Sequence, residues 1–346
     1  MAQETSTRRL SKERLRLLMV QNGVLFAVVA LIVFFAVLSP RFLTGPNILT
    51  ILLQISELGL LALPVAFLIM QANVDLSVGS IAALASVCGA MTMVASGSMW
   101  LGILAALVIG ALAGLINGFL VSIVGLNSFV VTLGFMSAWL GLAQLLSDGK
   151  SISGLPGEFT AVGSFSVFGV RVQILVLVVG IVLAWWVLNH SARGREILAV
   201  GGNMRASQLM GLKVHRVRVS TYVVAGVVAA IVGLMLTAKL QAASPVIGQG
   251  WELQALTVVL LGGIAFEGGS GRIRSVIYGL IFVGVLNNGL VILGVSPYVQ
   301  TILVGLTLVV AVSLDRGIQQ AIAKTIAQSA RRRQRRESAS KAEERN

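Results

Sequence analysis

Long apolar segments separated by short polar ones make up most of this chain. Uncharged, strongly hydrophobic runs occupy residues 20–38, 48–71, 76–95, 100–124, 128–147, 172–189, 219–238, 253–266, 275–294 and 297–314. Most of these runs are close to the roughly 20 residues that a helix needs to cross a bilayer. The pattern predicts an all-α membrane protein with about ten transmembrane helices, or nine or eleven. The run 253–266 is short, so we expect it to be tilted, re-entrant or partly outside the membrane.

The composition agrees with this prediction and excludes most soluble functions. The 346 residues are 56% hydrophobic and only 11% charged, whereas soluble domains are about 25% charged. The net charge of +13 would suggest nucleic acid in a soluble chain. Here the basic residues gather between apolar runs, so we expect no nucleic-acid partner. The single cysteine, Cys88, lies in an apolar run and cannot form an intramolecular disulfide.

The basic residues also predict the orientation. With the N-terminus placed inside and the runs alternating, the inside segments hold 22 of the Lys and Arg residues and the outside segments hold four. We therefore expect both termini in the cytoplasm, and we expect the first run to be a retained span rather than a cleaved signal peptide. The predicted parts are a cytoplasmic segment 1–19, a transmembrane domain 20–314 with a basic cytoplasmic loop 190–218, and a basic tail 315–346. The tail is expected to be disordered and could contact anionic membrane lipid.

Two similar stretches predict an internal repeat. Asn117-Gly118 followed by residues 128–132 resembles Asn288-Gly289 followed by residues 297–301. The two copies lie five predicted spans apart, and an odd number of spans inverts the second copy, as in many transporters. An inverted repeat of five helices is therefore expected.

Several polar groups lie within or between the predicted spans. Glu57 stands ten residues into its run, where a charge is costly and should face the protein interior, water or an interface. Pro64 is expected to kink or break that helix. Asp75 and Ser77 can cap the following helix, and broken helices of this kind also occur beside solute paths in transporters. Gly110, Gly114 and Gly118 share one helical face, which predicts close helix packing.

The residues that enzymes need are missing from the predicted membrane region. Both histidines, His190 and His215, fall in the basic loop, and no metal-binding spacing occurs. Gly149-Lys150-Ser151 resembles the end of a phosphate-binding loop, but the position that requires the first glycine is Gln144. We therefore expect neither covalent chemistry nor a cofactor in this chain. If ATP drives its function, another subunit must hydrolyse it.

Three stretches together resemble the permease subunits of bacterial ABC importers of the ribose, xylose, arabinose and galactose type. The first is Val74-Asp-Leu-Ser-Val-Gly-Ser80, and the second runs from Gly194-Arg195 through Ala199-Val-Gly-Gly-Asn203 to Gly211-Leu-Lys-Val214. The third contains Glu252-Leu253, Gly262-Gly263, Gly268-Gly269-x-Gly271 and Leu286-Asn-Asn-Gly-Leu290. The resemblance covers about residues 40–315. It departs from the usual family pattern at Ser207 and at Ile264–Glu267, and the related permeases for branched-chain amino acids share parts of the first two stretches.

The resemblance implies a permease in the bacterial cytoplasmic membrane that works with three kinds of partner. These are an ABC ATPase that binds ATP and magnesium, an extracytoplasmic solute-binding protein, and a second permease copy that makes a homodimer or heterodimer. It implies that a short helix near Asn203–Gly211 docks on the ATPase. The coupling residues are then Gly194, Arg195, Gly201, Gly202, Asn203, Arg205, Ala206, Gly211 and Leu212. The candidate path residues are Glu57, Asn73, Asp75, Ser77, Asn117, Asn127, Thr132, Asn287 and Asn288.

The sequence leaves other functions open beside sugar or polyol import. An ion-gradient-driven transporter would need an intramembrane acid, and Glu57 is the acid well inside a run. A permease for another solute, such as a branched-chain amino acid, shares part of the motifs. An intramembrane enzyme is disfavoured because no embedded His, Lys or paired carboxylates supply acid and base groups.

Overall fold

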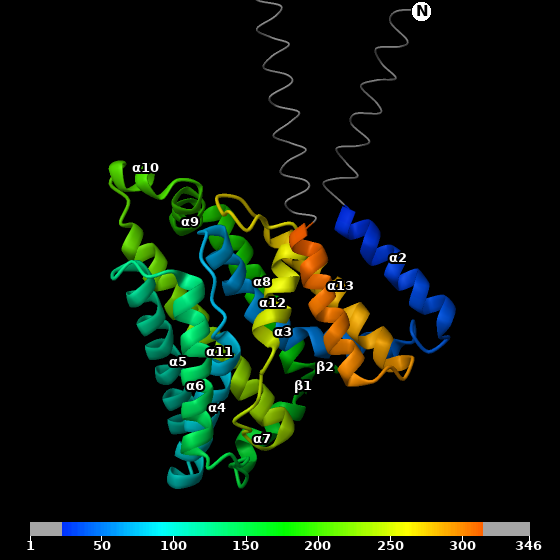
Figure 1. The fold of residues 1–346 in the computed structure, drawn as a ribbon. Helices are drawn as coiled ribbons and strands as arrows, with labels where there is room; N and C mark the ends of the chain where they lie inside the picture. The colour runs from blue at the N-terminus through cyan, green and yellow to red at the C-terminus, as the bar shows by residue number, and fades with distance from the viewer. Residues whose placement is uncertain (1–22, 314–346) are drawn as a thin grey trace, which may run out of the picture. The chain divides into compact units, whose positions relative to one another are not determined.

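The computed structural model describes residues 23–313, which fold almost entirely into helices (Figure 1). Residues 24–308 form one compact unit, and the other described residues, Gly23 and 309–313, lie in helices. The helices of the first half are α2 (Gly23–Leu38), α3 (Gly45–Met70), α4 (Val78–Ser96), α5 (Met99–Ser122), α6 (Ser128–Leu146) and α7 (Gly157–Ser164). Strands β1 (Ser166–Val167) and β2 (Val170–Arg171) follow, and then α8 (Val172–His190), α9 (Ala192–Gly202), α10 (Met204–Leu209), α11 (Val214–Leu240), α12 (Trp251–Leu261) and α13 (Ile273–Ile292). A last helix spans Pro297–Ser313.

The hydrophobic runs coincide with helices throughout the described residues. Seven of these helices are long and apolar enough to cross a membrane, namely α3, α4, α5, α6, α8, α11 and α13. Three more, α2, α12 and Pro297–Ser313, are apolar but have 10–17 residues. The prediction of an all-α, multi-pass membrane protein is confirmed, while the count of ten spans, the cytoplasmic termini and the inverted repeat stay predictions. The terminal segments 1–19 and 315–346 lie outside the described residues.

Helix α3 is the central element of the compact unit. Every residue from Ile55 to Met70 is buried, and α8, α11, α12 and α13 all pack against it. The reason is in its sequence, since this part of α3 is apolar on all sides and such a helix is stable only when it is surrounded. The helix continues past Pro64 to Met70, so the proline does not break it. Neighbouring packed helices make an internal proline tolerable in membrane proteins.

Helices α5 and α11 approach each other backbone to backbone, as the glycine face predicts. Gly110 and Gly114 of α5 face Gly226 and Tyr222 of α11 so closely that a Cβ atom at either glycine would overlap a carbonyl oxygen of α11. A Cβ atom on Gly118 would lie 3.0 Å from the Val219 Cα atom. The prediction that these glycines serve close packing is confirmed, and α4 completes this group of helices.

The connection between α6 and α8 contains additional structure. Residues 148–171, rich in glycine and serine, form the short helix α7 and the antiparallel hairpin β1–β2. Ile152 pairs with Ala243 in an isolated bridge, which joins this segment to the connection between α11 and α12. Helix α7 packs against the end of α11, where Gly163 touches the Ala238 backbone. The two connections on this side of the unit are therefore fastened to each other.

Candidate functional site

The connection between α3 and α4 holds a buried polar network, called here the broken-helix network. The Asp75 carboxylate oxygen Oδ1 accepts hydrogen bonds from the Ser77 backbone N–H at 2.8 Å and from the Ser77 hydroxyl at 2.6 Å. Asn117 of α5 donates its Nδ2 to the same hydroxyl at 2.7 Å. All three side chains are buried. Asp75 thus fixes Ser77, the N-cap residue of α4, but neither side chain accepts a hydrogen bond from the first turn of α4, so the side-chain capping that the sequence suggested is not formed.

Helices α6 and α11 hold the backbone of the same connection. The Thr132 hydroxyl accepts from the Leu76 N–H at 3.1 Å, and the Ser128 hydroxyl accepts from the Val74 N–H at 3.3 Å. The Tyr222 hydroxyl donates to the Val74 carbonyl at 3.0 Å. Residues from α3, α5, α6 and α11 therefore meet at one non-helical segment, and such segments occur in membrane proteins where protein buries them.

Four predicted path residues meet in this network: Asp75, Ser77, Asn117 and Thr132. Asn73 lies in the same connection but donates its Nδ2 to the Gln71 carbonyl at 3.2 Å. Asp75 Oδ2 and Asn117 Oδ1 have no hydrogen-bond partner among the described residues. Burial raises the pKa of the Asp75 carboxyl, and the hydrogen bonds from Ser77 oppose that shift. Asn127 does not join the network. It is the N-cap of α6, and its Oδ1 accepts from the N–H groups of Phe129 and Val130.

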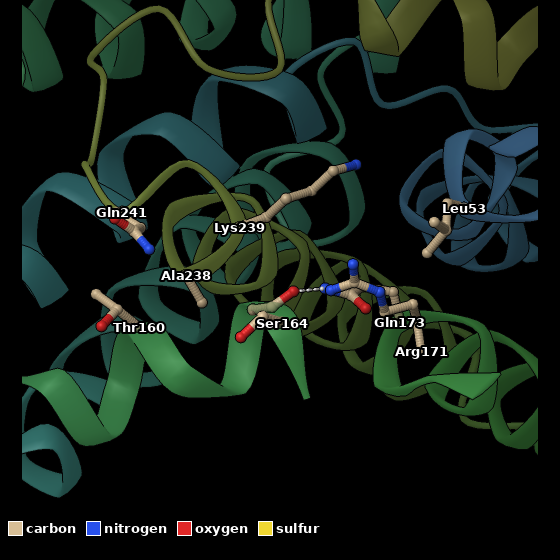
Figure 2. A pocket seen from close by; sticks show the side chains of 9 residues that line it. Leu53, Thr160, Ser164, Arg171, Gln173, Ala238, Lys239 and Gln241 are labelled. Atoms are coloured by element: carbon tan, nitrogen blue, oxygen red, sulfur yellow. Dashed lines mark hydrogen bonds between the residues drawn. The ribbon is translucent and has the colours of Figure 1, made fainter. Parts of the chain in front are cut away.

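Glu57 forms an ion pair far from the broken-helix network. Its Oε1 lies 3.0 Å from Nζ of Lys239, near the end of α11, and its side chain is 1% exposed while that of Lys239 is 38% exposed. Lys239 also lines a cavity of about 220 Å³ beside Gln173 and Arg171. Figure 2 shows these three side chains and the hydrogen bond from the Gln173 amide to Gly163. The sequence did not indicate this partner for Glu57, because the two residues are 182 positions apart.

We expect Glu57→Gln to destabilise the chain by about 1–3 kcal/mol, between the values for exposed and fully buried ion pairs. The lost partner is a half-exposed ammonium group that water can still reach. Thermal denaturation of the detergent-solubilised chain measures this effect. The double variant Glu57→Gln/Lys239→Met should recover part of the loss, because it leaves no unpaired cation. If the double variant were no more stable than Glu57→Gln alone, this account of the pair would be contradicted.

Asn287 and Asn288, adjacent on α13, have different surroundings. Asn288 is buried and exchanges two hydrogen bonds with Asn47 of α3, at 2.9 and 3.0 Å. Its Nδ2 also donates to Gln54 Oε1 at 3.5 Å. Asn287 instead lines a cavity of about 300 Å³ between α3, α12, α13 and the last helix. The predicted path residues therefore fall into three separate places, and Asn127 lies in none of them.

The segment 190–218, called here the coupling segment, forms two short helices and the start of α11. Helix α9 is buried on one side, where Gly194 touches the end of α8 and Gly201 touches the Met70 carbonyl at the end of α3. The Gly269 N–H also donates to that carbonyl at 2.9 Å. The second and third of the sequence stretches that carry the family resemblance are therefore in contact at the end of α3.

The other side of the coupling segment is exposed. Helix α10 confirms the short helix expected near Asn203–Gly211, and Asn203 caps it by accepting from the Ala206 N–H at 2.9 Å. Leu209 and Met210 are 82% and 83% exposed. These two residues were not among the predicted coupling residues. Of the predicted ones, Gly194 is buried and Gly201 and Leu212 are half-buried, and the exposed ones are Arg195, Gly202, Asn203, Arg205, Ala206 and Gly211.

Seven helices long and apolar enough to cross a membrane, around a buried central helix, define a multi-pass membrane protein. Residues 47–312 match the family model described as "Branched-chain amino acid transport system / permease component". The chain belongs to this family of ABC-importer permeases and is a multi-pass protein of the cell membrane. No solved structure matches it.

Curated relatives place it near sugar permeases of the same family. It is 38% identical over 288 residues to a ribose import permease protein of Bacillus subtilis, covering 83% of this chain and 89% of the relative. It is 35% identical to a D-allose transport system permease protein of Escherichia coli, covering 86% of this chain and 92% of the relative. It is 34% identical to an L-arabinose transport system permease protein of the same organism, with 87% and 92% covered. The resemblance to sugar-importer permeases is confirmed.

Proposed function

We propose that this chain is the membrane subunit of an ATP-driven importer and forms the path for a monosaccharide or a similar polyol. The observation that supports this most strongly is the similarity, over more than four-fifths of the chain, to permeases named for ribose, allose and arabinose. The chain itself performs no covalent step. A separate ATPase supplies ATP hydrolysis with its magnesium, a solute-binding protein delivers the sugar, and a second permease copy completes the path.

The coupling segment supports a mechanical link to the ATPase. Leu209 and Met210 present apolar side chains at the tip of α10, and such side chains are stable in a membrane protein's water-facing part when a partner covers them. Arg205 on the same short helix is exposed and can pair with an acidic side chain. Helix α9 connects this tip to the end of α3 through the tight contact of Gly201 with Met70. Movement of the ATPase would therefore reach the central helix as a rigid-body shift.

We expect Leu209→Asp to leave the chain folded in the membrane but to reduce its co-purification with the ATPase at least tenfold. A carboxylate would have to be desolvated in an apolar contact, which costs several kcal/mol. Quantitative immunoblotting of the two subunits after affinity capture measures the effect. The matched control is Gln208→Asp, because Gln208 is exposed beside Leu209 on α10. Leu145→Asp would not serve, because Leu145 lies in a membrane helix.

Both variants of α10 add one negative charge, so a loss of co-purification confined to Leu209→Asp reports the apolar contact of Leu209. Equal loss in both variants would show only that added negative charge is harmful, and retention by both would contradict the docking role of α10. Gly211→Arg tests the docking of α10 less directly than Leu209→Asp does. Gly211 has φ +83°, where a side chain is strained, although no atom lies within 4 Å of its Cβ position.

The solute class is tested by uptake. A strain that lacks this chain should lose ATP-dependent uptake of one or more of D-ribose, D-allose and L-arabinose, and regain it with the chain restored. Uptake of labelled leucine should not change. The family model's description makes branched-chain amino acids the second candidate, and loss of leucine uptake with normal sugar uptake would establish it. An ion-gradient-driven transporter is disfavoured because Glu57 is paired with Lys239.

A further inference from the structure

A cavity of about 300 Å³, called here the amide cavity, lies between α3, α12, α13 and the last helix. It is distinct from the broken-helix network and from the cavity beside Lys239. Its polar lining consists of four carboxamides and one hydroxyl, from Gln54, Gln254, Asn287, Gln300 and Thr301. No charged side chain is among the described residues that line it. Four carboxamides around one space are an unusual lining in a membrane protein. Gln254, Asn287 and Gln300 are half-buried there, and Gln54 is exposed at the edge of the cavity.

The hydrogen bonds around the amide cavity leave both donors and acceptors available. Gln300 donates its Nε2 to the Val295 carbonyl at 2.8 Å, so its Oε1 is the free end. Gln54 accepts from Asn288 at 3.5 Å through Oε1, so its Nε2 is the free end. Within residues 23–313, the carboxamides of Gln254 and Asn287 have no hydrogen-bond partner. A neutral ligand with hydroxyl groups can both donate to and accept from such a set.

The remaining lining is aromatic and aliphatic. Trp251, the first residue of α12, contributes an indole ring, and Ile55, Leu58 and Val291 contribute aliphatic surface. An indole offers a flat apolar face and one N–H donor. A monosaccharide has the complementary surface, because its ring carries C–H groups on its faces and hydroxyl groups around its edge.

The wall that carries these carboxamides is held in place by the Asn47–Asn288 pair. Each of these side chains donates to the other, which fixes the C-terminal part of α13 against the start of α3. Asn288 also reaches Gln54, so a buried polar residue orients one member of the cavity. Fixed polar groups around an apolar space are the usual composition of a small-molecule site.

We propose that the amide cavity binds one neutral monosaccharide, stacked on Trp251 and hydrogen-bonded by Gln254 and Asn287. This inference rests on the proposed function, and it adds a solute site within a single permease chain. The cavity volume of about 300 Å³ lies at the lower end of the roughly 300–1,000 Å³ of ligand pockets, which favours one sugar ring over two. The lack of a lining charge disfavours an amino acid, whose ammonium and carboxylate groups would be left without counter-charges.

Tryptophan fluorescence tests the site directly. The chain has five tryptophans, and replacing Trp100, Trp139, Trp185 and Trp186 by Phe leaves Trp251 as the only emitter. The full-length variant in lipid nanodiscs is titrated with D-ribose, D-allose and L-arabinose, with maltose as the control for osmotic and viscosity effects. We expect a saturable emission change with at least one monosaccharide and none with maltose.

Two substitutions in the single-tryptophan chain locate the binding. Asn287→Leu should weaken sugar binding about fivefold or more, the effect of one or two lost hydrogen bonds. Asn189→Leu is the matched control, because Asn189 is exposed on α8 and its amide donates only to the Trp185 carbonyl of its own helix. It should leave binding unchanged. If the single-tryptophan chain and its Asn287→Leu and Asn189→Leu variants all bound sugar equally well, the sugar would bind elsewhere and the inference would be overturned.

Uptake by the same variants separates this inference from the proposed function. If the importer transports one of the three sugars but Trp251 shows no saturable response to it, the sugar site is wrong and the function stands. If none of the three sugars is transported and a monosaccharide still binds, the site stands and sugar import is wrong. No transport together with no response overturns both.

Discussion

The substitution Gly201→Ala should reduce sugar uptake at least tenfold while leaving the chain in the membrane. Gly201 lies where helix α9 meets the end of α3, and an added Cβ atom would overlap the Met70 carbonyl oxygen and lie 2.7 Å from the Gly269 nitrogen. Both obstacles are backbone atoms, so no side-chain rotation relieves the overlap. The coupling segment must therefore shift away from α3, and the Gly269–Met70 hydrogen bond should be lost. Uptake per membrane-inserted chain measures the result.

The next residue provides the control. A Cβ atom on Gly202 would be 3.8 Å from the Gly269 Cα atom, an ordinary contact distance. Gly202→Ala therefore makes the same chemical change in the same helix without the overlap, and uptake should stay within about twofold of normal. If both variants transported equally well, the contact between α9 and α3 would not carry the coupling. If both failed, exposed Gly202 would have a role of its own at the ATPase.

Gly226→Ala should destabilise the chain by about 1–3 kcal/mol or more, as expected for overpacking a filled interior. Gly226 of α11 faces Gly110 of α5, and its added Cβ atom would overlap the Gly110 carbonyl oxygen and lie 3.1 Å from the Gly114 nitrogen. The two helices would have to separate along their whole contact. Thermal unfolding in detergent, followed by size-exclusion chromatography, should show the loss as a lower midpoint.

Gly134→Ala is the matched control for Gly226→Ala. Gly134 is inside helix α6, and its Cβ position has no atom within 4 Å in this chain. Alanine in a helix interior is favoured over glycine by about 1 kcal/mol, so this variant should be neutral or slightly stabilised. A loss of stability in Gly226→Ala with none in Gly134→Ala would confirm that the α5–α11 contact depends on glycine. A stable Gly226→Ala chain would contradict the close approach of these helices.

The length of the apolar runs predicted the helices, because a helix that crosses a bilayer needs about 20 apolar residues. It also predicted that the run 253–266 is short for a span, and the structure has an 11-residue helix, Trp251–Leu261, at this place. The segment 148–171 was less predictable. Its helix α7 has eight residues, too few for a periodic pattern, and the glycine and serine content indicated a loop.

The candidate sites could be predicted only in part, because their partners are distant in sequence. Asp75 and Ser77 are two positions apart, so a local contact between them could be predicted, but Asn117 joins Ser77 from 40 positions away. The pair of Glu57 and Lys239 joins residues on two helices that no motif links. Gln54, Trp251 and Gln254 look like ordinary polar interruptions until the fold places them around one cavity. Asn127 has a local role that the fold makes clear, since it is the N-cap of α6, and its place on a solute path stays a prediction.

The most direct test of the importer assignment is affinity capture of the tagged chain from native membranes in a mild detergent, followed by mass spectrometry. We predict near-stoichiometric recovery of an ABC-type ATPase, with loss of that ATPase in the Leu209→Asp variant. Recovery of the wild-type chain alone, across several detergents, would contradict the account. Glu57 would then be the next residue to test, as the acid of an ion-driven transporter.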